Sequence, residues 1–471
     1  MTTSAAQIVQ VRKPKMMAFV FMFAAFIGLY SETALNMALT NIMSEFSVSE
    51  ATVQWLTTGY LLTLGILVPI STLLIQWFTT KQLVITSLAF SIAGTILAAL
   101  APSFSLLLSG RIIQAVGTGI LLPLMMNVIL LIFPIQKRGA VMGIMGLVIT
   151  TAPAVGPAAA GFIVDTWSWP YIFWISLIFY AALVIFGLRP IDNVSRITKP
   201  AIDVTSIACS TIGFGGLIYS LSNISEKSFL SAEVWIPFVI GALAIAIFIR
   251  RQIKMEVPMI NLRVFQYRMF ALGTLLVFLG MILILSTAIL LPLYIKGSLL
   301  FSAAMAGIIL VPGSAVNAML SPIVGRLFDQ FGARRFVPIG FLLTVISCIC
   351  FLLSISDTAP VWKIIAACVI LFMGIPMIIM PAQTNGLNQL PRSLYADGAA
   401  VMNTLQQIAG ATGTAFAITL MVSGQNRFMN QNADFTSPEL LAAGTKYAFI
   451  FIAVIAVIGF VSSLFVRRVR V

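Results

Sequence analysis

The segment MMAFVFMFAAFIGLYSETALNMAL, residues 16–39, carries one charged side chain, Glu32, in a run that is otherwise long and apolar. A helix needs about 20 apolar residues to cross the hydrocarbon core of a bilayer, so this segment predicts a membrane-spanning helix. A carboxylate at that depth is costly unless it has a partner or water, and such residues usually mark functional positions. Glu32 is therefore the first candidate functional residue.

The whole chain has the composition of a membrane protein. Its 471 residues are 60% hydrophobic and 9% charged, and the mean hydropathy is +1.06, whereas about 25% of residues are charged in soluble domains. In a soluble protein the net charge of +13 would suggest nucleic-acid binding. In a membrane protein, Lys and Arg collect in cytoplasmic loops, so we expect the lipid bilayer as a partner and no nucleic acid.

Fourteen apolar segments are predicted to span the membrane. They are residues 16–39, 53–75, 82–101, 105–132, 139–163, 170–188, 203–222, 234–250, 269–295, 303–328, 335–355, 361–385, 396–422 and 445–466. With the N-terminus in the cytoplasm, 21 of the 27 Lys and Arg residues fall in cytoplasmic loops or tails, five fall outside and Arg111 falls within a span. This bias supports fourteen spans with both termini in the cytoplasm.

Two polar or basic linkers, residues 189–199 and 250–268, flank a pair of spans with few special residues. We therefore expect an all-α membrane protein with a six-helix bundle (residues 1–188), an inserted pair of helices with its linkers (189–268) and a second six-helix bundle (269–471). The polar segment 423–445 is predicted to be the largest outside the membrane and helical in part.

Arg111 is the second charge within a span, in LLLSGRIIQAVGTG, residues 106–119. At about 1.5 Å per residue, Arg111 lies roughly 10 Å from the outer end of its helix and Glu32 roughly 24 Å from the inner end of its own. In a core about 30 Å thick both lie in the outer half, so we predict that they pair, directly or through water. Because the chain contains no histidine, carboxylates must carry any proton. Alternatively, Arg111 only caps backbone carbonyls of a neighbouring helix.

Uncharged polar and aromatic side chains close to these charges are candidate substrate-binding residues. The candidates are Asn36, Gln54, Trp55, Thr58, Gln114 and Thr118. Single polar residues in membrane helices as often hold neighbouring helices together, so that interpretation also stays open.

Two further segments suggest moving parts. The small residues of GIMGLVITTAPAVGPAAAG, residues 143–161, offer a smooth face for close helix approach. In GRLFDQFGARR, residues 325–335, Asp329 lies among arginines near helix ends, where charges interact with the helix dipole. Asp329 forms either a latch that breaks when the halves move or part of a solvated loop. The residues assigned to conformational change are Gly143, Gly156, Pro157, Gly161, Gly325, Arg326, Asp329, Gly332, Arg334 and Arg335.

Together these motifs resemble the Major Facilitator Superfamily, specifically its fourteen-helix drug:proton antiporters, over nearly the whole chain. GRIIQAVGTG resembles the family's fourth-helix motif, with Arg111 at the arginine linked to proton transfer. Residues 143–161 are similar to the antiporter motif, although Ala152 and Ala160 replace glycines. MNTLQQIAGATGTA, residues 402–415, is most similar to the lincomycin-resistance type of exporter.

Three positions depart from that family pattern. Ile75 stands where the family usually has an aspartate, so the latch of Asp329 lacks a charged counterpart. Ser31 aligns with a position at which the family often has an aspartate, and Glu32 is the next residue. Gln406 replaces an arginine common in relatives, which bears on the charge of the substrate.

The resemblance implies proton-coupled multidrug efflux across a bacterial cell membrane, with Glu32 as proton carrier paired with Arg111. The expected partners are small lipophilic drug-like substrates and protons. An exporter of an endogenous lipid or metabolite with the same coupling is the alternative. A channel or a membrane enzyme is disfavoured, because no selectivity-filter, metal-binding or nucleophile pattern is found and the four cysteines lie in apolar runs. No cofactor is expected.

Overall fold

The computed structural model describes residues 11–195, 197–199, 202–223, 231–255, 258–431 and 436–468, apart from the side chains of residues 40, 50, 51, 135, 154, 157, 158, 222, 303 and 304. All regular structure within these ranges is helical. The predicted all-α class is therefore confirmed, whereas Pro157 lies outside the described side chains.

The elements follow one another along the chain in three groups. The first half comprises α1 (Pro14–Ala34), the 3-10 turn η1 (Leu35–Met37), α2 (Leu39–Phe46), α3 (Glu50–Trp77), α4 (Thr80–Ala99), α5 (Phe104–Ile132), α6 (Ile135–Thr166), α7 (Tyr171–Ala182) and the π-helical turn η2 (Leu183–Gly187). The pair predicted to be an insertion is α8 (Val204–Asn223) and α9 (Ala232–Lys254). The second half comprises the turn η3 (Leu262–Gln266) with α10 (Arg268–Gly297), α11 (Ala303–Phe331), α12 (Ala333–Ser354), α13 (Val361–Asn388), the turn η4 (Arg392–Leu394), α14 (Tyr395–Gln431) and α15 (Ser437–Ser463).

Within the described ranges, twelve helices are long and apolar enough to cross a membrane. They are α1 with η1, α3, α4, α5 and the eight helices α8 to α15. The 32-residue helix α6 and the apolar stretch of α7 with η2 are not among the twelve. Both coincide with predicted spans, 139–163 and 170–188, and the count of fourteen spans stays a prediction.

Helices occupy two segments outside the predicted spans. α2 lies between the first two spans, where the hydropathy pattern predicted none, and its Ile42 is buried. α14 continues to Gln431 and α15 begins at Ser437, so the described part of segment 423–445 is mainly helical. An amphipathic helix such as α2 has too few apolar residues to register as a span.

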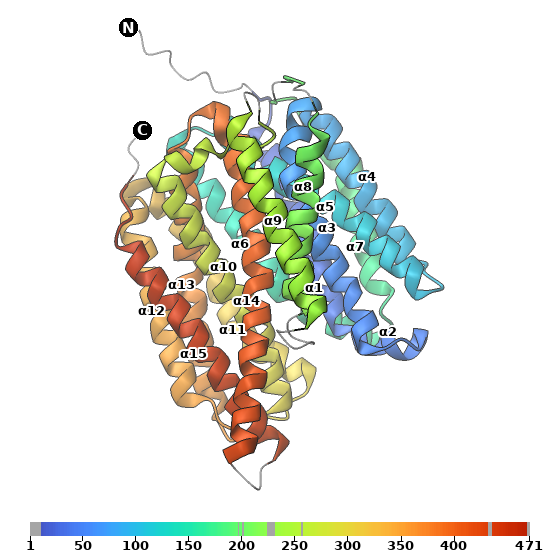
Figure 1. The fold of residues 1–471 in the computed structure, drawn as a ribbon, viewed down its shortest axis with the longest axis vertical. Coiled ribbons are helices and arrows are strands. Elements are labelled where there is room, and N and C mark those ends of the chain that lie inside the picture. The colour runs from blue at the N-terminus through green and yellow to red at the C-terminus, as the bar shows by residue number, and fades with distance from the viewer. Residues whose placement is uncertain are drawn as a thin grey trace.

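The two halves lie side by side, the first in blue to teal and the second in yellow-green to red (Figure 1). α8 and α9, in green, lie where the halves meet (Figure 1). α1 begins and α15 ends at the same end of the bundle, uppermost in Figure 1. This end is called the terminal end below.

α6 of the first half packs closely on α11 of the second half. A Cβ atom added to Gly143 would lie 2.7 Å from the carbonyl oxygen of Ser321 and 2.9 Å from Cα of Gly325. Such a backbone contact is open only to glycine, and small residues commonly permit it between membrane helices. The predicted smooth face of α6 therefore meets the other half of the molecule.

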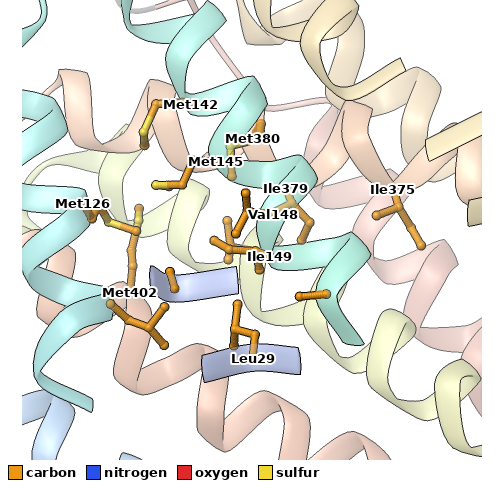
Figure 2. Packing of buried hydrophobic residues seen from close by; sticks show 14 of the residues in the cluster. Leu29, Met126, Met142, Met145, Val148, Ile149, Ile375, Ile379, Met380 and Met402 are labelled. Atoms are coloured by element: carbon orange, nitrogen blue, oxygen red, sulfur yellow. The ribbon is translucent and has the colours of Figure 1, made fainter. Parts of the chain in front are cut away.

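A large apolar cluster fills the region between the halves (Figure 2). Leu29 of α1, Met126 of α5, Met145 of α6, Met380 of α13 and Met402 of α14 all belong to it. Because both halves contribute, separation of the halves would expose this cluster.

Candidate functional site

Glu32 lies in the last turn of α1, partly buried, and its Oε2 atom is buried without a hydrogen-bond partner. The neighbours one turn before and after it contact α3: the Gly28 carbonyl accepts a hydrogen bond from the Tyr60 hydroxyl (3.1 Å) and Asn36 Oδ1 accepts from Thr57 (2.9 Å). Residues four apart share one face of a helix. Glu32 is therefore on the face of α1 that looks toward α3.

Arg111 of α5 is fully buried beside α1. Its Nη1 donates hydrogen bonds to the Ser31 carbonyl (3.0 Å), to Ser31 Oγ (3.0 Å) and to Gln114 Oε1 (2.6 Å). Its guanidinium carbon lies 4.3 Å from the centre of the Tyr60 ring, within the range of a cation–π interaction. Nε and Nη2 of Arg111 are buried and have no partner.

The side chains around Arg111 form one hydrogen-bonded network. Gln114 Nε2 donates to Thr95 Oγ1 (2.9 Å), and the hydroxyls of Tyr60 and Thr118 are 2.8 Å apart. α4 approaches closely because of Gly94, where a Cβ would lie 2.4 Å from the Gln114 backbone nitrogen. This close packing removes water from the guanidinium, which raises the cost of leaving its donors unpaired.

Glu32 and Arg111 form no ion pair among the described residues. The guanidinium instead bonds to Ser31, the residue directly before Glu32. It therefore does cap a backbone carbonyl, as the alternative prediction held. Each partner of the predicted pair nevertheless keeps an unpaired buried polar atom. The proton-carrying role of Glu32 stays a prediction.

The six candidate substrate-binding residues fall into two groups. Gln114 and Thr118 belong to the Arg111 network, and Asn36 bonds to Thr57. Gln54, Trp55 and Thr58 of α3 form no described hydrogen bond, and the Trp55 ring lies 5.7 Å from that of Tyr219 on α8.

Tyr60, Ser31 and Thr95 are parts of the network that were not predicted. Only Ser31 had a signal in the sequence, because it aligns with a position at which the family often has an aspartate. Tyr60 and Thr95 lie in apolar spans, where nothing distinguishes them from residues that only pack.

At the terminal end, Asp329 of α11 joins the two halves. Its carboxylate accepts hydrogen bonds from the backbone nitrogens of Gly139 (2.8 Å) and Ala140 (3.0 Å) of α6. A Cβ on Gly139 would lie 2.3 Å from Asp329 Oδ1, so this contact requires glycine. Bonds from N–H groups to a carboxylate are charge-assisted and comparatively strong. Asp329 therefore bonds to the α6 backbone instead of to a charged side chain near Ile75, and its role as a latch stays a prediction.

Arg138, near the start of α6, makes a second connection between the halves. Its side chain is 2% exposed, and Nη1 donates to Asn388 Oδ1 and to the Tyr395 hydroxyl, both at 3.0 Å. Nε and Nη2 donate to the carbonyls of Phe133 and Leu130. This arginine was counted only as a cytoplasmic loop charge, and the structure places it in the interface.

The remaining conformational residues have mixed surroundings. A Cβ on Gly156 would lie 2.4 Å from Thr33 Oγ1 of α1, whereas Gly161 has no atom within 4 Å of that position. Gly332, with φ of 75°, separates α11 from α12 in a conformation that favours glycine. The three arginines of this set, Arg326, Arg334 and Arg335, are exposed.

Further hydrogen bonds between described residues of the halves join Asn317 to Thr150 (2.8 Å) and link Gln383 and Asn403 to the Met126 sulfur. None of the hydrogen bonds described between the halves involves α1 or Arg111. The halves are therefore held together from the terminal end to the middle of the bundle, and the Arg111 network lies wholly within the first half.

Comparison with known proteins identifies the family. The family model described as Major Facilitator Superfamily matches residues 21–414. The chain belongs to the Major Facilitator Superfamily. A solved structure, that of the human organic anion transporter MFSD10, has the same fold, with a TM-score of 0.67 at 13% identity over 96% of this chain and 99% of its own.

Curated relatives match most or nearly all of the chain. Lincomycin resistance protein LmrB of Listeria innocua is 52% identical over 454 residues, 96% of each chain. Lincomycin resistance protein LmrB of Bacillus subtilis is 49% identical over 96% of this chain and 95% of its own. Multidrug export protein EmrB of Escherichia coli is 26% identical over 90% and 83%. The chain is thus a multi-pass protein of the bacterial cell membrane from a family of transporters.

Proposed function

We propose that this chain is a proton-coupled exporter of small lipophilic drug-like molecules, with Glu32 as proton carrier. The observation that carries the proposal is the pair of unsatisfied groups at the end of α1, a carboxylate oxygen of Glu32 and two nitrogens of Arg111. The similarity to lincomycin resistance proteins and to a multidrug export protein supports the drug-export part.

The proposed topology has fourteen spans, with α6 and α7–η2 added to the twelve apolar helices. Both termini are cytoplasmic, as the loop charges favour, so the terminal end faces the cytoplasm. The chain divides into bundles at residues 1–188 and 269–471 with the insertion 189–268 between them. With the terminal end held closed by Asp329 and Arg138, this arrangement corresponds to an outward-facing transporter.

In this state the carboxyl of Glu32 is best understood as neutral. A carboxylate with one oxygen buried and unpaired is costly, whereas the protonated form costs less. Loss of the proton would create a charge that attracts the unpaired donors of Arg111. The guanidinium would then leave Ser31, and the contact between α1 and α5 would change. Through this change of partner at Arg111, proton binding at Glu32 is coupled to the packing of α1 on α5.

The energy for export comes from the proton gradient. One charge moving through 100 mV supplies about 2.3 kcal/mol, which corresponds to roughly a fiftyfold concentration ratio. A single proton per cycle is therefore sufficient for substantial drug accumulation outside the cell.

The test is drug transport in proteoliposomes with an imposed pH gradient. Glu32→Gln should abolish gradient-driven transport of lincomycin while binding of the drug is retained. Glu45→Gln is the matched control, because Glu45 accepts a hydrogen bond from Trp169 at the outer end and lies outside the Arg111 network. Unchanged transport by Glu32→Gln would reject the coupling scheme.

A further inference from the structure

Three amide side chains of the second half are buried where it meets the first half. Gln383 of α13 and Asn403 of α14 are 0% and 6% exposed, and both donate to the Met126 sulfur of α5, at 3.7 and 3.8 Å. Gln406, 5% exposed, follows Asn403 by one helical turn and lies on the same face of α14. Gln383 and Asn403 therefore contact the first half, and the helical spacing predicts that Gln406 lies beside Asn403.

Asn403 also donates to the Ala399 carbonyl at 2.8 Å, whereas the other two amides keep unpaired atoms. Oε1 of Gln383 and Nε2 of Gln406 are buried without a partner. The thioether that receives the Gln383 amide is a weak acceptor. Buried polar groups nearly always find a partner in folded proteins. An acceptor and a donor left open in one interface are therefore groups that a second state of the molecule uses.

A methionine cluster adjoins two of the amides at Met126. Met126, Met142, Met145, Met380 and Met402 come from α5, α6, α13 and α14 and converge in the same region (Figure 2). Methionine side chains are flexible and polarisable, and surfaces rich in them adapt to differently shaped ligands. When the contacts of Arg138 and Asp329 break, this surface becomes accessible from the terminal end.

We infer that Gln383, Asn403 and Gln406, with the adjoining methionines, form the site that takes up substrate from the terminal end, and that it binds substrate in an uncharged form. This inference rests on the proposed function and specifies the substrate class. The ligand has an apolar body, a donor for Gln383 Oε1 and an acceptor for Gln406 Nε2. None of these lining residues is charged, and a cation without a counter-charge would bind there at a large desolvation cost.

The consequence for coupling is that substrate charge does not compete with the proton at Glu32. Each cycle that exchanges a neutral molecule for one proton moves one net charge. Transport then responds to membrane potential as well as to the pH gradient.

The test uses two probes in proteoliposomes that carry a pH gradient. Chloramphenicol is uncharged and bears amide and hydroxyl groups, and ethidium is a permanent cation. Wild type should transport chloramphenicol at least tenfold faster than ethidium. Replacing both Gln383 and Gln406 by methionine should reduce chloramphenicol transport at least tenfold. Gln252→Met is the matched control and should stay within twofold of wild type, because Gln252 of α9 is a buried amide bonded to Ser206 and Ile260.

A second variant separates loss of substrate binding from misfolding, because its expected effect is a gain of transport. Gln406→Glu places a negative charge on the lining and should raise ethidium transport at least fivefold over wild type. Equal transport of both probes by wild type, or full chloramphenicol transport by the double variant, would overturn the inference while leaving proton-coupled export intact. If neither probe moves under the gradient in wild type, the proposed function fails and the inference fails with it.

Discussion

Replacing Tyr395 by phenylalanine removes one atom from the contact that closes the terminal end. The Tyr395 hydroxyl accepts a hydrogen bond from Arg138 Nη1 at 3.0 Å, and the guanidinium carbon lies 4.9 Å from the ring centre. Phenylalanine keeps the ring and its cation–π interaction. Asn388 and two backbone carbonyls still accept from Arg138. The substitution therefore isolates a single bond between the halves.

A hydrogen bond to a charged group contributes about 1.5–3 kcal/mol. Because this bond joins the halves only while the terminal end is closed, its loss shifts the equilibrium toward opening by that amount. Since about 1.4 kcal/mol corresponds to a factor of ten, the ratio of open to closed molecules should rise roughly 10- to 150-fold.

Cysteine labelling measures this ratio. The four native cysteines are replaced by serine and Met145, which is fully buried between the halves, is replaced by cysteine. The labelling rate with a polar maleimide should rise by the same factor in Tyr395→Phe. Tyr294→Phe is the control, because the Tyr294 hydroxyl donates to the Ser356 carbonyl within the second half. A labelling rate within twofold of wild type would refute the assignment of Arg138 as a contact that holds the terminal end closed.

Three other perturbations follow from the described contacts. Asp329→Asn loses at least one charge-assisted bond to α6, about 1.5–3 kcal/mol, so the same labelling should accelerate more than tenfold; an unchanged rate would contradict the latch. Gly325→Ala places a Cβ 2.5 Å from a backbone oxygen of α6 and should lower the thermal midpoint by several degrees, whereas Gly161→Ala, with open space at its Cβ, should not. Arg251 holds the pKa of Asp203 at about 2, below the ordinary 3.8. The pair therefore stabilises the fold above about pH 4 and loses this effect as pH falls toward 2. The difference in thermal midpoint between wild type and Asp203→Asn should shrink over that range. A difference independent of pH would exclude a stabilising role for the charged Asp203–Arg251 pair.

The hydropathy pattern predicted the helical class and most helices because lipid imposes one requirement on every span. A spanning helix must be long and apolar, and that is visible in sequence. The same reasoning located Glu32 and Arg111, because charges in apolar runs are rare and conspicuous. It also placed both in the first half, on neighbouring helices.

The exact partners were not predictable, because many of them are backbone groups. Arg111 bonds to the Ser31 carbonyl, and Asp329 bonds to the N–H groups of Gly139 and Ala140. Every residue except proline carries both kinds of group, so no sequence motif marks the ones that are used.

Arg138 shows the limit of counting charges. In the loop tally it was one of many cytoplasmic cations, and such residues are usually solvated. The start of α6 beside α13 and α14 buries it, and this placement depends on tertiary packing between segments about 250 residues apart. The amides of Gln383 and Gln406 became conspicuous for the same reason, through burial without partners.

Helix α8, which is predicted to belong to an insertion, contacts both halves through apolar groups. Gly215 and Ile218 pack against Ile66 and Gly65 of α3, and the same helix meets Ala411 of α14. Among its described residues, none donates to or accepts from α3 or α14. A shift of α8 along these surfaces would therefore change packing contacts and break no hydrogen bond among the described residues. We therefore expect α8 to stay in apolar contact with both halves when they tilt relative to each other, and to keep lipid tails out of the space between them.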